Sequence, residues 1–391
     1  MVILNSLPEQ GLQRDFSPQS TGAAGTLALA HIPGAALKGT PGGITLKQCL
    51  QLTPLEIAQK SAAVKAGFRF LLKMGGEIQD RGIRHIIVSI LHQPVPKFMA
   101  RYPSIKEREM LHRQLAAEGL LEPVEVAVEH LLPNLANPAQ PPQPLISAPG
   151  SDYMSHHSYP GGLVIHTSFN LCSSLGLYDG YAKVYGIKLH RDVVIAAQIL
   201  HDLAKTWVLQ WQNTHNPQPE YPLAGSGAHH VLGLAESLYR GLPAEVVVAQ
   251  ACAHGNVGLP PEEEKIVRYL KAAAIIAGKD PVKAGLLSAC GTTVARRRRI
   301  ESLVTYLGDH DWIVSVPAAR WTIAALRQVA CADYGMTQAE LNSGKFNTLR
   351  NYTFSQATML GLYHKYISEG EAGFRSAVNE LVQPAGCYRI E

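Results

Sequence analysis

The sequence of 391 residues predicts an all-α protein, on two observations. Apolar residues recur at helical spacing through much of residues 46–391, and Thr, Gly and Pro residues mark several expected helix ends. With 46% hydrophobic residues, the chain can bury a substantial core in two or three domains. A net charge of +4 singles out no class of partner.

The N-terminal third divides into an arm and a helical region. Residues 1–45 are rich in Gly, Ala, Pro and Thr and are predicted to be extended or partly disordered, because they bury too little apolar area to offset their ordering entropy. Residues 46–135 are predicted to be helical. A first helix begins at Thr53, before Pro54, and ends at Gly75-Gly76. Two further helices are predicted in SIKEREMLHRQLAAEGLL and VEVAVEHLL.

Residues 136–152 break this pattern with five prolines and a glycine. Proline at this density favours an extended, semi-rigid conformation. We predict a linker that precedes the next domain, although the same composition suits a strap packed on one domain.

Residues 153–285 are predicted to form a metal-binding domain, because histidines and a carboxylate lie on apolar, helix-forming segments. Burying such groups among Val, Ile and Leu is costly unless something satisfies them, and a metal ion does so well. Within about ninety residues the chain places, in order, His166, His201, Asp202, His229 and His254.

The segment RDVVIAAQILHDLAKTW carries the central pair of these groups. His201 and Asp202 are adjacent, so they point about 100° apart on a helix and can converge on an ion from two sides. Lys205 follows Asp202 by three residues, on the same side, and could bond that carboxylate or balance charge on a phosphate. The alternative is a surface lysine. His254 ends an apolar helix, where a histidine interacting with the helix dipole is the alternative to a ligand.

A turn precedes the first of these helices. Gly161 and Gly162 permit a sharp reversal and a close backbone approach, and a helix N-terminus is a ready anion site. His156 and His157 could therefore face a substrate phosphate, or they could be solvent-facing histidines beside a simple turn. Either His229 or His230 could face the ion.

Three segments, GGLVIHT, ILHDLAK and GAHHVLGLAESL, resemble the HD superfamily of metal-dependent phosphohydrolases over about residues 150–285. The resemblance implies an HD-domain-like helical bundle with additional N- and C-terminal helices. It also implies one or two divalent transition ions (Fe, Mn, Co, Ni or Zn), a metal type that imidazole and carboxylate ligands suit. The implied metal ligands are His166, His201, Asp202, His229 and His254, with Lys205 and His157 as catalytic residues and His156, Gly161, Gly162 and His230 as substrate-binding residues.

One position departs from the family pattern. A distal Asp is expected on a later helix, where the segment IVRYLKAAAIIAGKDP places Ala274. Asp280, six residues on and about 9 Å along a helix axis, is one candidate for the missing ligand. The other candidates are Asp309 and Asp311 in the segment GDHDW. For that segment a capping role is the alternative to a metal or substrate role.

Residues 286–391 are predicted to be helical. The run Arg296 to Arg299 could bind nucleic-acid phosphates, but a solvated helix face is favoured because no larger basic surface accompanies it. Six scattered cysteines suit free thiols in a reducing compartment. With no membrane-length apolar run and no secretory signal pattern, the cytoplasm is the expected location.

These features predict a hydrolase that uses a metal-activated water to cleave a phosphomonoester or phosphodiester. The resemblance implies a small, nucleotide-like substrate. The start HHSYPGGL also resembles HD domains of some exoribonucleases and relaxase-linked proteins, which would fit an oligonucleotide. Two alternatives remain: a di-iron oxygenase on the same helical scaffold, and a ligand-binding or regulatory module that has lost turnover. The sequence gives no oligomeric state.

Overall fold

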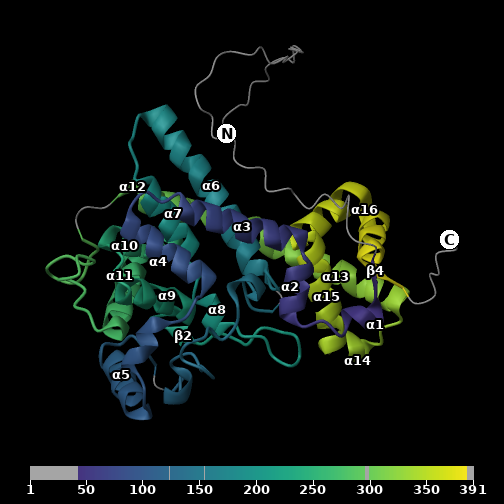
Figure 1. The fold of residues 1–391 in the computed structure, drawn as a ribbon, viewed down its shortest axis with the longest axis horizontal. Coiled ribbons are helices and arrows are strands. Elements are labelled where there is room, and N and C mark those ends of the chain that lie inside the picture. The colour runs from purple at the N-terminus through teal and green to yellow at the C-terminus, as the bar shows by residue number, and fades with distance from the viewer. Residues whose placement is uncertain (1–42, 123, 154, 296–298, 385–391) are drawn as a thin grey trace, which may run out of the picture. The chain divides into compact units, whose positions relative to one another are not determined.

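The computed structural model describes residues 43–122, 124–153, 155–295 and 299–384. Helices dominate them, which confirms the all-α prediction (Figure 1). Two short sheets join distant or neighbouring segments. Strand β1 (Ile44–Thr45) pairs in parallel with β4 (Val382–Gln383), and β2 (Pro222–Leu223) pairs antiparallel with β3 (Ser226–Gly227). The predicted N-terminal arm lies outside the described residues up to residue 42.

The N-terminal region contains more breaks than the sequence predicts. The helix expected from Thr53 to Gly76 begins and ends there, but Ser61 divides it. The Ser61 backbone is extended, and its hydroxyl caps the second half by accepting the Val64 N–H. The prediction of a helix in the segment VEVAVEHLL is wrong. The segment has one 3-10 turn, and it is anchored by Leu131 and Leu132, which are both buried in the core. The helices are α1 (Leu46–Cys49), α2 (Pro54–Lys60), α3 (Ala62–Gly76), α4 (Arg81–His92) and α5 (Ile105–Ala117), with 3-10 turns η1 (Lys97–Arg101) and η2 (Val128–His130).

The central region positions the histidines. Helix α6 packs against α3, α7 and α12 (Figure 1). The helix expected through RDVVIAAQILHDLAKTW ends at Leu200 and resumes at Lys205, so His201 and Asp202 lie in the turn between two helices. The elements are α6 (Gly162–Tyr185), α7 (Arg191–Leu200), α8 (Lys205–Val208), α9 (Ala228–Tyr239), α10 (Ala244–Ala251), η4 (Cys252–His254) and α11 (Pro260–Ala277).

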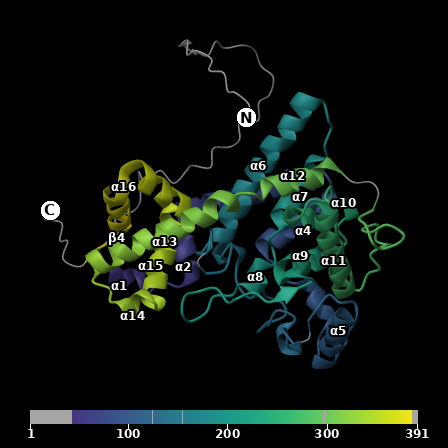
Figure 2. The same ribbon diagram turned by 180° about the vertical axis from the view of Figure 1, so that it is seen from behind.

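The C-terminal region is helical as predicted, with α13 and α16 packed along each other (Figure 2). The segment FSQATMLGLYHKYISEG, predicted as one helix, is divided at Thr358, whose φ of 60° ends one helix and caps the next. The helices are α12 (Ile300–Gly308), α13 (Trp312–Tyr334), α14 (Gln338–Leu341), α15 (Gly344–Ala357) and α16 (Met359–Leu381).

Two hydrophobic clusters form the core of the described residues. The larger takes residues between 58 and 294, and the other joins Cys49, Ile57 and Tyr159 to residues 318–382. Part of the predicted linker is packed rather than free: η3 (Leu145–Ser147) contacts α2 and α6, and Leu145 is buried. This part of the predicted linker therefore packs against helices on both sides of it in the sequence.

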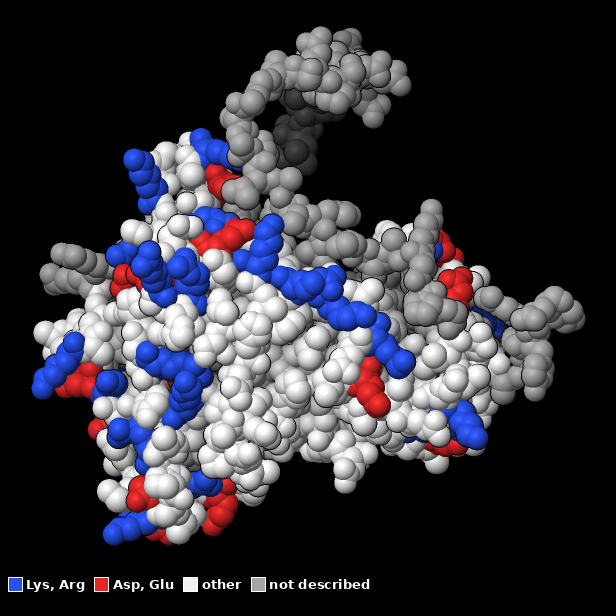
Figure 3. Space-filling model, viewed as in Figure 1, with Lys and Arg blue, Asp and Glu red and all other residues white. Residues whose placement is uncertain are grey.

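Two predictions concern the basic run Arg296 to Arg299 and membrane-spanning helices. On the face in Figure 3 a row of Lys and Arg crosses the middle, with carboxylates near both of its ends. Arg296 to Arg298 lie outside the described residues, while Arg299 is the residue that precedes α12. No helix in the described part of the chain is both long and apolar enough to span a membrane.

Candidate metal centre

The structure brings the five histidine and aspartate residues proposed as metal ligands into one cluster, together with Asp309. All of them except His201 line one pocket. They arrive from α6, the α7–α8 turn, the start of α9, η4 and the loop after α12. His166, His201 and both carboxylates are almost fully buried, and the side chain of His254 is 18% exposed. Residues more than a hundred positions apart thus meet at one point.

Two imidazole nitrogens and two carboxylate oxygens form a first group of potential ligand atoms. His166 Nε2 lies 3.1 Å from both Asp202 Oδ2 and Asp309 Oδ1. His201 Nε2 lies 3.4 Å and 3.3 Å from the same two oxygens, and 3.3 Å from His166 Nε2. Ligands held at about 2.0–2.2 Å from one ion are about 2.8–3.6 Å apart, depending on geometry. His166, His201 and Asp202 have the spacing of a metal coordination sphere, and Asp309 Oδ1 lies within 3.3 Å of both imidazole nitrogens.

The other oxygens of the two carboxylates face a second group. Asp202 Oδ1 lies 3.2 Å from His229 Nε2 and 3.5 Å from His254 Nε2. Asp309 Oδ2 lies 3.3 Å from His254 Nε2. Each carboxylate therefore presents one oxygen to each group, as a ligand shared by two neighbouring ions would.

The hydrogen bonding fits a cation at this place. Asp202 Oδ1 and His229 Nε2 are buried and make no hydrogen bond with any described residue, although they lie 3.2 Å apart. Leaving such atoms unpaired in the interior costs about 1–3 kcal/mol each. A metal ion bound between them would satisfy both, so the donor set suits the predicted type of ion.

Neighbouring groups orient two of the imidazoles. His201 Nδ1 donates to the Gln198 carbonyl at 2.7 Å, and His229 Nδ1 donates to the Glu220 carboxylate at 2.7 Å. Because Nδ1 is engaged in these hydrogen bonds, Nε2 is the ring nitrogen that faces the carboxylates. Such outer hydrogen bonds fix the tautomer and raise the basicity of a metal ligand.

The pKa values of the site residues show how strongly the buried carboxylates interact with neighbouring cations. Although burial raises the pKa of Asp202, Lys205 and His201 hold it well below its usual range. Burial lowers the pKa of His201, but Asp202 and Asp309 outweigh it and raise that pKa to about 10. Although burial raises the pKa of Asp309, His201 and the hydrogen bond from His166 likewise hold it well below its usual range, so both carboxylates are anions.

Lys205 supplies part of that charge. Its Nζ donates to Asp202 Oδ2 at 2.5 Å and to the Gly150 carbonyl at 2.7 Å. The side chain is 9% exposed and lines the pocket, so the alternative of a surface lysine is wrong.

His156 and His157 are buried beside the cluster, not solvent-facing. His157 Nε2 donates to Asp311 Oδ2 at 2.7 Å, whereas His156 lines the pocket. Close packing leaves no room for a side chain at either glycine. A Cβ on Gly162 would lie 1.8 Å from the His157 carbonyl oxygen, and one on Gly161 would clash with Val64. Neither glycine is among the residues that line the pocket in the described structure.

Of the remaining candidate site residues, some lie at the cluster and others lie outside it. Asp280 is exposed outside the cluster, and its carboxylate accepts the N–H groups of Val282 and Lys283. Ala274 is buried in α11. Of the two aspartates in GDHDW, the structure places Asp309 in the cluster and pairs Asp311 with His157. His230 lines the pocket, with its ring 3.7 Å from that of His254.

Sequence reasoning missed two polar partners of the cluster. Asn170 donates to Asp309 Oδ1 at 2.6 Å, and its position one helical turn after His166 is a signal that could have identified it. Glu220 lies in an irregular loop, where no periodicity points to it.

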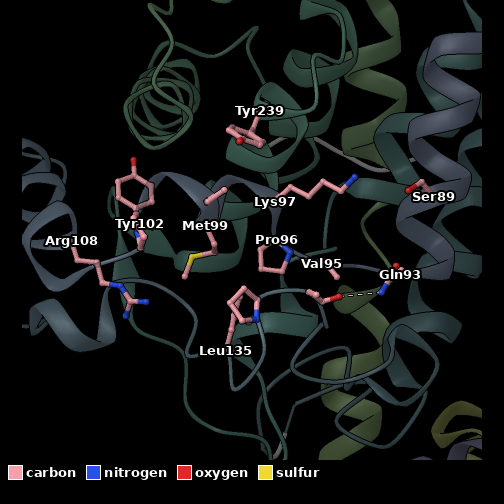
Figure 4. A pocket seen from close by; sticks show the side chains of 14 residues that line it. Ser89, Gln93, Val95, Pro96, Lys97, Met99, Tyr102, Arg108, Leu135 and Tyr239 are labelled. Atoms are coloured by element: carbon pink, nitrogen blue, oxygen red, sulfur yellow. Dashed lines mark hydrogen bonds between the residues drawn. The ribbon is translucent and has the colours of Figure 1, made fainter.

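The pocket at the cluster has a volume of about 320 Å³. Another pocket, of about 540 Å³, lies elsewhere (Figure 4). Its lining contains Lys97 and Arg108 but neither histidine nor carboxylate, so it lacks the groups that metal-assisted chemistry requires. The smaller pocket is the candidate reaction site. It is lined by His156, His166, Asp202, Lys205, His229, His230, Ala253, His254, Glu262, Tyr306, Asp309, His310 and Trp312.

Comparison with known proteins finds a partial relative. The chain is 33% identical over 103 residues to a dihydroneopterin 2',3'-cyclic phosphate phosphodiesterase of Methanocaldococcus jannaschii. The match covers 26% of this chain and 40% of that protein, so the chain matches less than half of the relative's length. No family model and no solved structure matches the chain. Part of the chain thus resembles an enzyme that cleaves a cyclic phosphodiester.

Proposed function

We propose that this protein is a metal-dependent phosphoric ester hydrolase of the HD superfamily, acting on a small, nucleotide-like phosphomonoester or phosphodiester. The observation that carries the proposal is the double set of ligand atoms around Asp202 and Asp309, at coordination spacing. The partial similarity to a cyclic phosphate phosphodiesterase supports the same chemistry.

The two groups of ligand atoms define which residues would hold ions. His166, His201 and one oxygen of each aspartate would hold one ion, and His229 and His254 with the opposite oxygens would hold a second. Imidazole and carboxylate ligands suit Fe, Mn, Co, Ni or Zn. Such an ion supplies a water of lowered pKa and polarises a phosphoryl oxygen.

The chain's own residues would bind and orient the phosphate. The Lys205 ammonium group is fixed by Asp202 and the Gly150 carbonyl, and it lines the pocket beside the cluster. A positioned cation there would stabilise charge that develops on the phosphoryl oxygens. His156 lines the same pocket and can donate a hydrogen bond to the substrate. His157 is not among the residues that line the pocket, and its Nε2 donates a hydrogen bond to Asp311. We therefore assign His157 a positioning role.

The first experiment is elemental analysis of protein purified without added metal, beside hydrolysis of an aryl phosphoester and a panel of nucleotides and 2',3'-cyclic nucleotides. We expect bound transition metal and turnover in the wild type. The Asp202→Ala variant should lose turnover and metal while its helical circular dichroism persists, because Asp202 contacts both ligand groups.

Undiminished metal content and turnover in Asp202→Ala would refute the assignment of the site. Metal without phosphoester turnover would favour another function. If oxygen is consumed and the spectrum is that of coupled irons, the di-iron oxygenase applies; without oxygen consumption, the regulatory module applies.

A further inference from the structure

A row of aromatic side chains lines the same pocket as the ligand cluster. It consists of Tyr306 in the last turn of α12, His310 in the α12–α13 connection and Trp312 at the start of α13. We call these three residues the aromatic wall. The Tyr306 and His310 rings lie 4.4 Å apart at 72°, and the His310 and Trp312 rings lie 6.0 Å apart at 39°.

Two features set the aromatic wall apart from ordinary core packing. His310 is held in place, because its Nδ1 donates to the Tyr306 carbonyl at 2.6 Å. Trp312 is 48% exposed, so a large part of its indole ring is open to solvent beside a polar pocket. Its neighbours Ile313 and Val314 are also exposed, but neither of them lines the pocket. A half-open indole ring at such a place is typical of a ligand-binding surface.

The chain fixes how far the aromatic wall lies from the ligand cluster. Asp309 contributes to the cluster, and Trp312 follows it by three residues, which limits the distance between their Cα atoms to about 10–11 Å. A phosphoester bound at the cluster could therefore place a ring, attached through one sugar-sized spacer, against Trp312.

We propose that the aromatic wall is a ring-binding subsite, which selects phosphoesters that carry a flat heteroaromatic ring over those that carry none. This inference rests on the proposed function and specifies its substrate class. Trp312 stacks on the ring and His310 supports it from the α12 side. Every heteroaromatic base has a flat face, so stacking of this kind selects for a ring without selecting one base.

A matched ligand pair and a matched variant pair test the subsite. Adenosine 5'-monophosphate and ribose 5-phosphate differ only in the base, and their binding to the full-length protein is measured by titration calorimetry. The variants are Trp312→Ala and Trp312→Phe. The control is Trp321→Ala, because Trp321 lies on the same helix, is 57% exposed and stacks on Tyr363 away from the pocket lining.

We expect the wild type to bind adenosine 5'-monophosphate more tightly than ribose 5-phosphate. Trp312→Ala should weaken binding of the nucleotide about 5- to 150-fold, the range seen when one base-stacking side chain is removed, and leave ribose 5-phosphate unchanged. Trp312→Phe should keep most of the preference, and Trp321→Ala should keep all of it.

Equal binding of the two ligands by the wild type, or no binding of either, would overturn the subsite. So would an equal loss for both ligands in Trp312→Ala, or the same selective loss in Trp321→Ala. A Trp312-dependent preference without any phosphoester turnover would leave the subsite standing and refute the proposed hydrolase. Turnover without a ring preference would do the reverse.

Discussion

Glu220 gives the sharpest test of the metal centre, because it touches the cluster through one ligand only. Its two oxygens accept from His229 Nδ1 at 2.7 Å and 2.8 Å, and one of them also accepts the His229 backbone N–H at 2.5 Å. Although burial raises the pKa of Glu220, His229 holds it below its usual value, so the group is an anion at neutral pH. Glu220→Gln keeps the shape and removes the charge.

Loss of such an outer partner typically lowers metal affinity 10- to 100-fold, or about 1.4–2.7 kcal/mol. We expect this loss for one ion only, since Glu220 supports His229 and none of the first group's ligands. The measurement is a competition titration of Zn²⁺ or Mn²⁺ against a chromophoric chelator, which resolves a tight and a weakened class of site.

The control is Glu262→Gln, since Glu262 lines the same pocket but its carboxylate pairs with Lys265 at 2.7 Å. It should bind metal nearly as the wild type does. An unchanged affinity in Glu220→Gln would contradict the role of His229 as a ligand. An equal loss at every site, or the same loss in the control, would contradict the division into two groups of ligands.

Three further predictions follow from other parts of the structure. Asp309→Asn should lose bound metal in elemental analysis and Asp280→Asn should not, because only Asp309 faces the histidines; the opposite pattern would restore Asp280 as the distal ligand. Trp207→Ala should cost about 3–5 kcal/mol of unfolding free energy in urea titration, because the ring is 1% exposed in the core; a cost below about 1 kcal/mol would contradict that packing. Hydrogen bonds from neighbouring hydroxyl groups lower the pKa of the exposed Cys290 thiol to about 7, so the thiolate fraction and the rate of iodoacetamide alkylation should rise to half of their maximum near pH 7. Peptide mapping should show Cys49 unmodified at that pH, since burial raises its pKa to about 12; equal labelling of both thiols would refute the assignment.

The helical breaks show where local sequence signals fail. Thr53 marks a helix start correctly, because its hydroxyl accepts the N–H of Glu56 only three residues on, and the second half of that segment ends at Gly76 as predicted. Ser61 and Thr358 divide helices that periodicity alone would continue. Ser61 does so in a tertiary setting, since its hydroxyl donates to the Ser355 carbonyl on α15. The two residues of this contact are 294 positions apart in the sequence, so the pattern of residues around Ser61 cannot predict it.

The distal carboxylate is the clearest case at the site. Spacing brought Asp280 into consideration because it lies near the expected helix, and it left Asp309 as one alternative. Only packing chooses between them: α12 lies against α6, α7 and η4, and this delivers Asp309 to His166, His201 and His254. The predicted domain boundary at residue 285 therefore falls before a residue that completes the cluster.

The sequence by itself determined the helical class and placed histidines and Asp202 on apolar segments, because amphipathic periodicity and the cost of burying polar groups are local properties. Only the tertiary structure decided which ligand atoms face one another. It also decided that Glu220 and Asn170 form hydrogen bonds with His229 and Asp309, and that Trp312 lines the same pocket. Those relations depend on how distant helices pack, and no single segment carries that information.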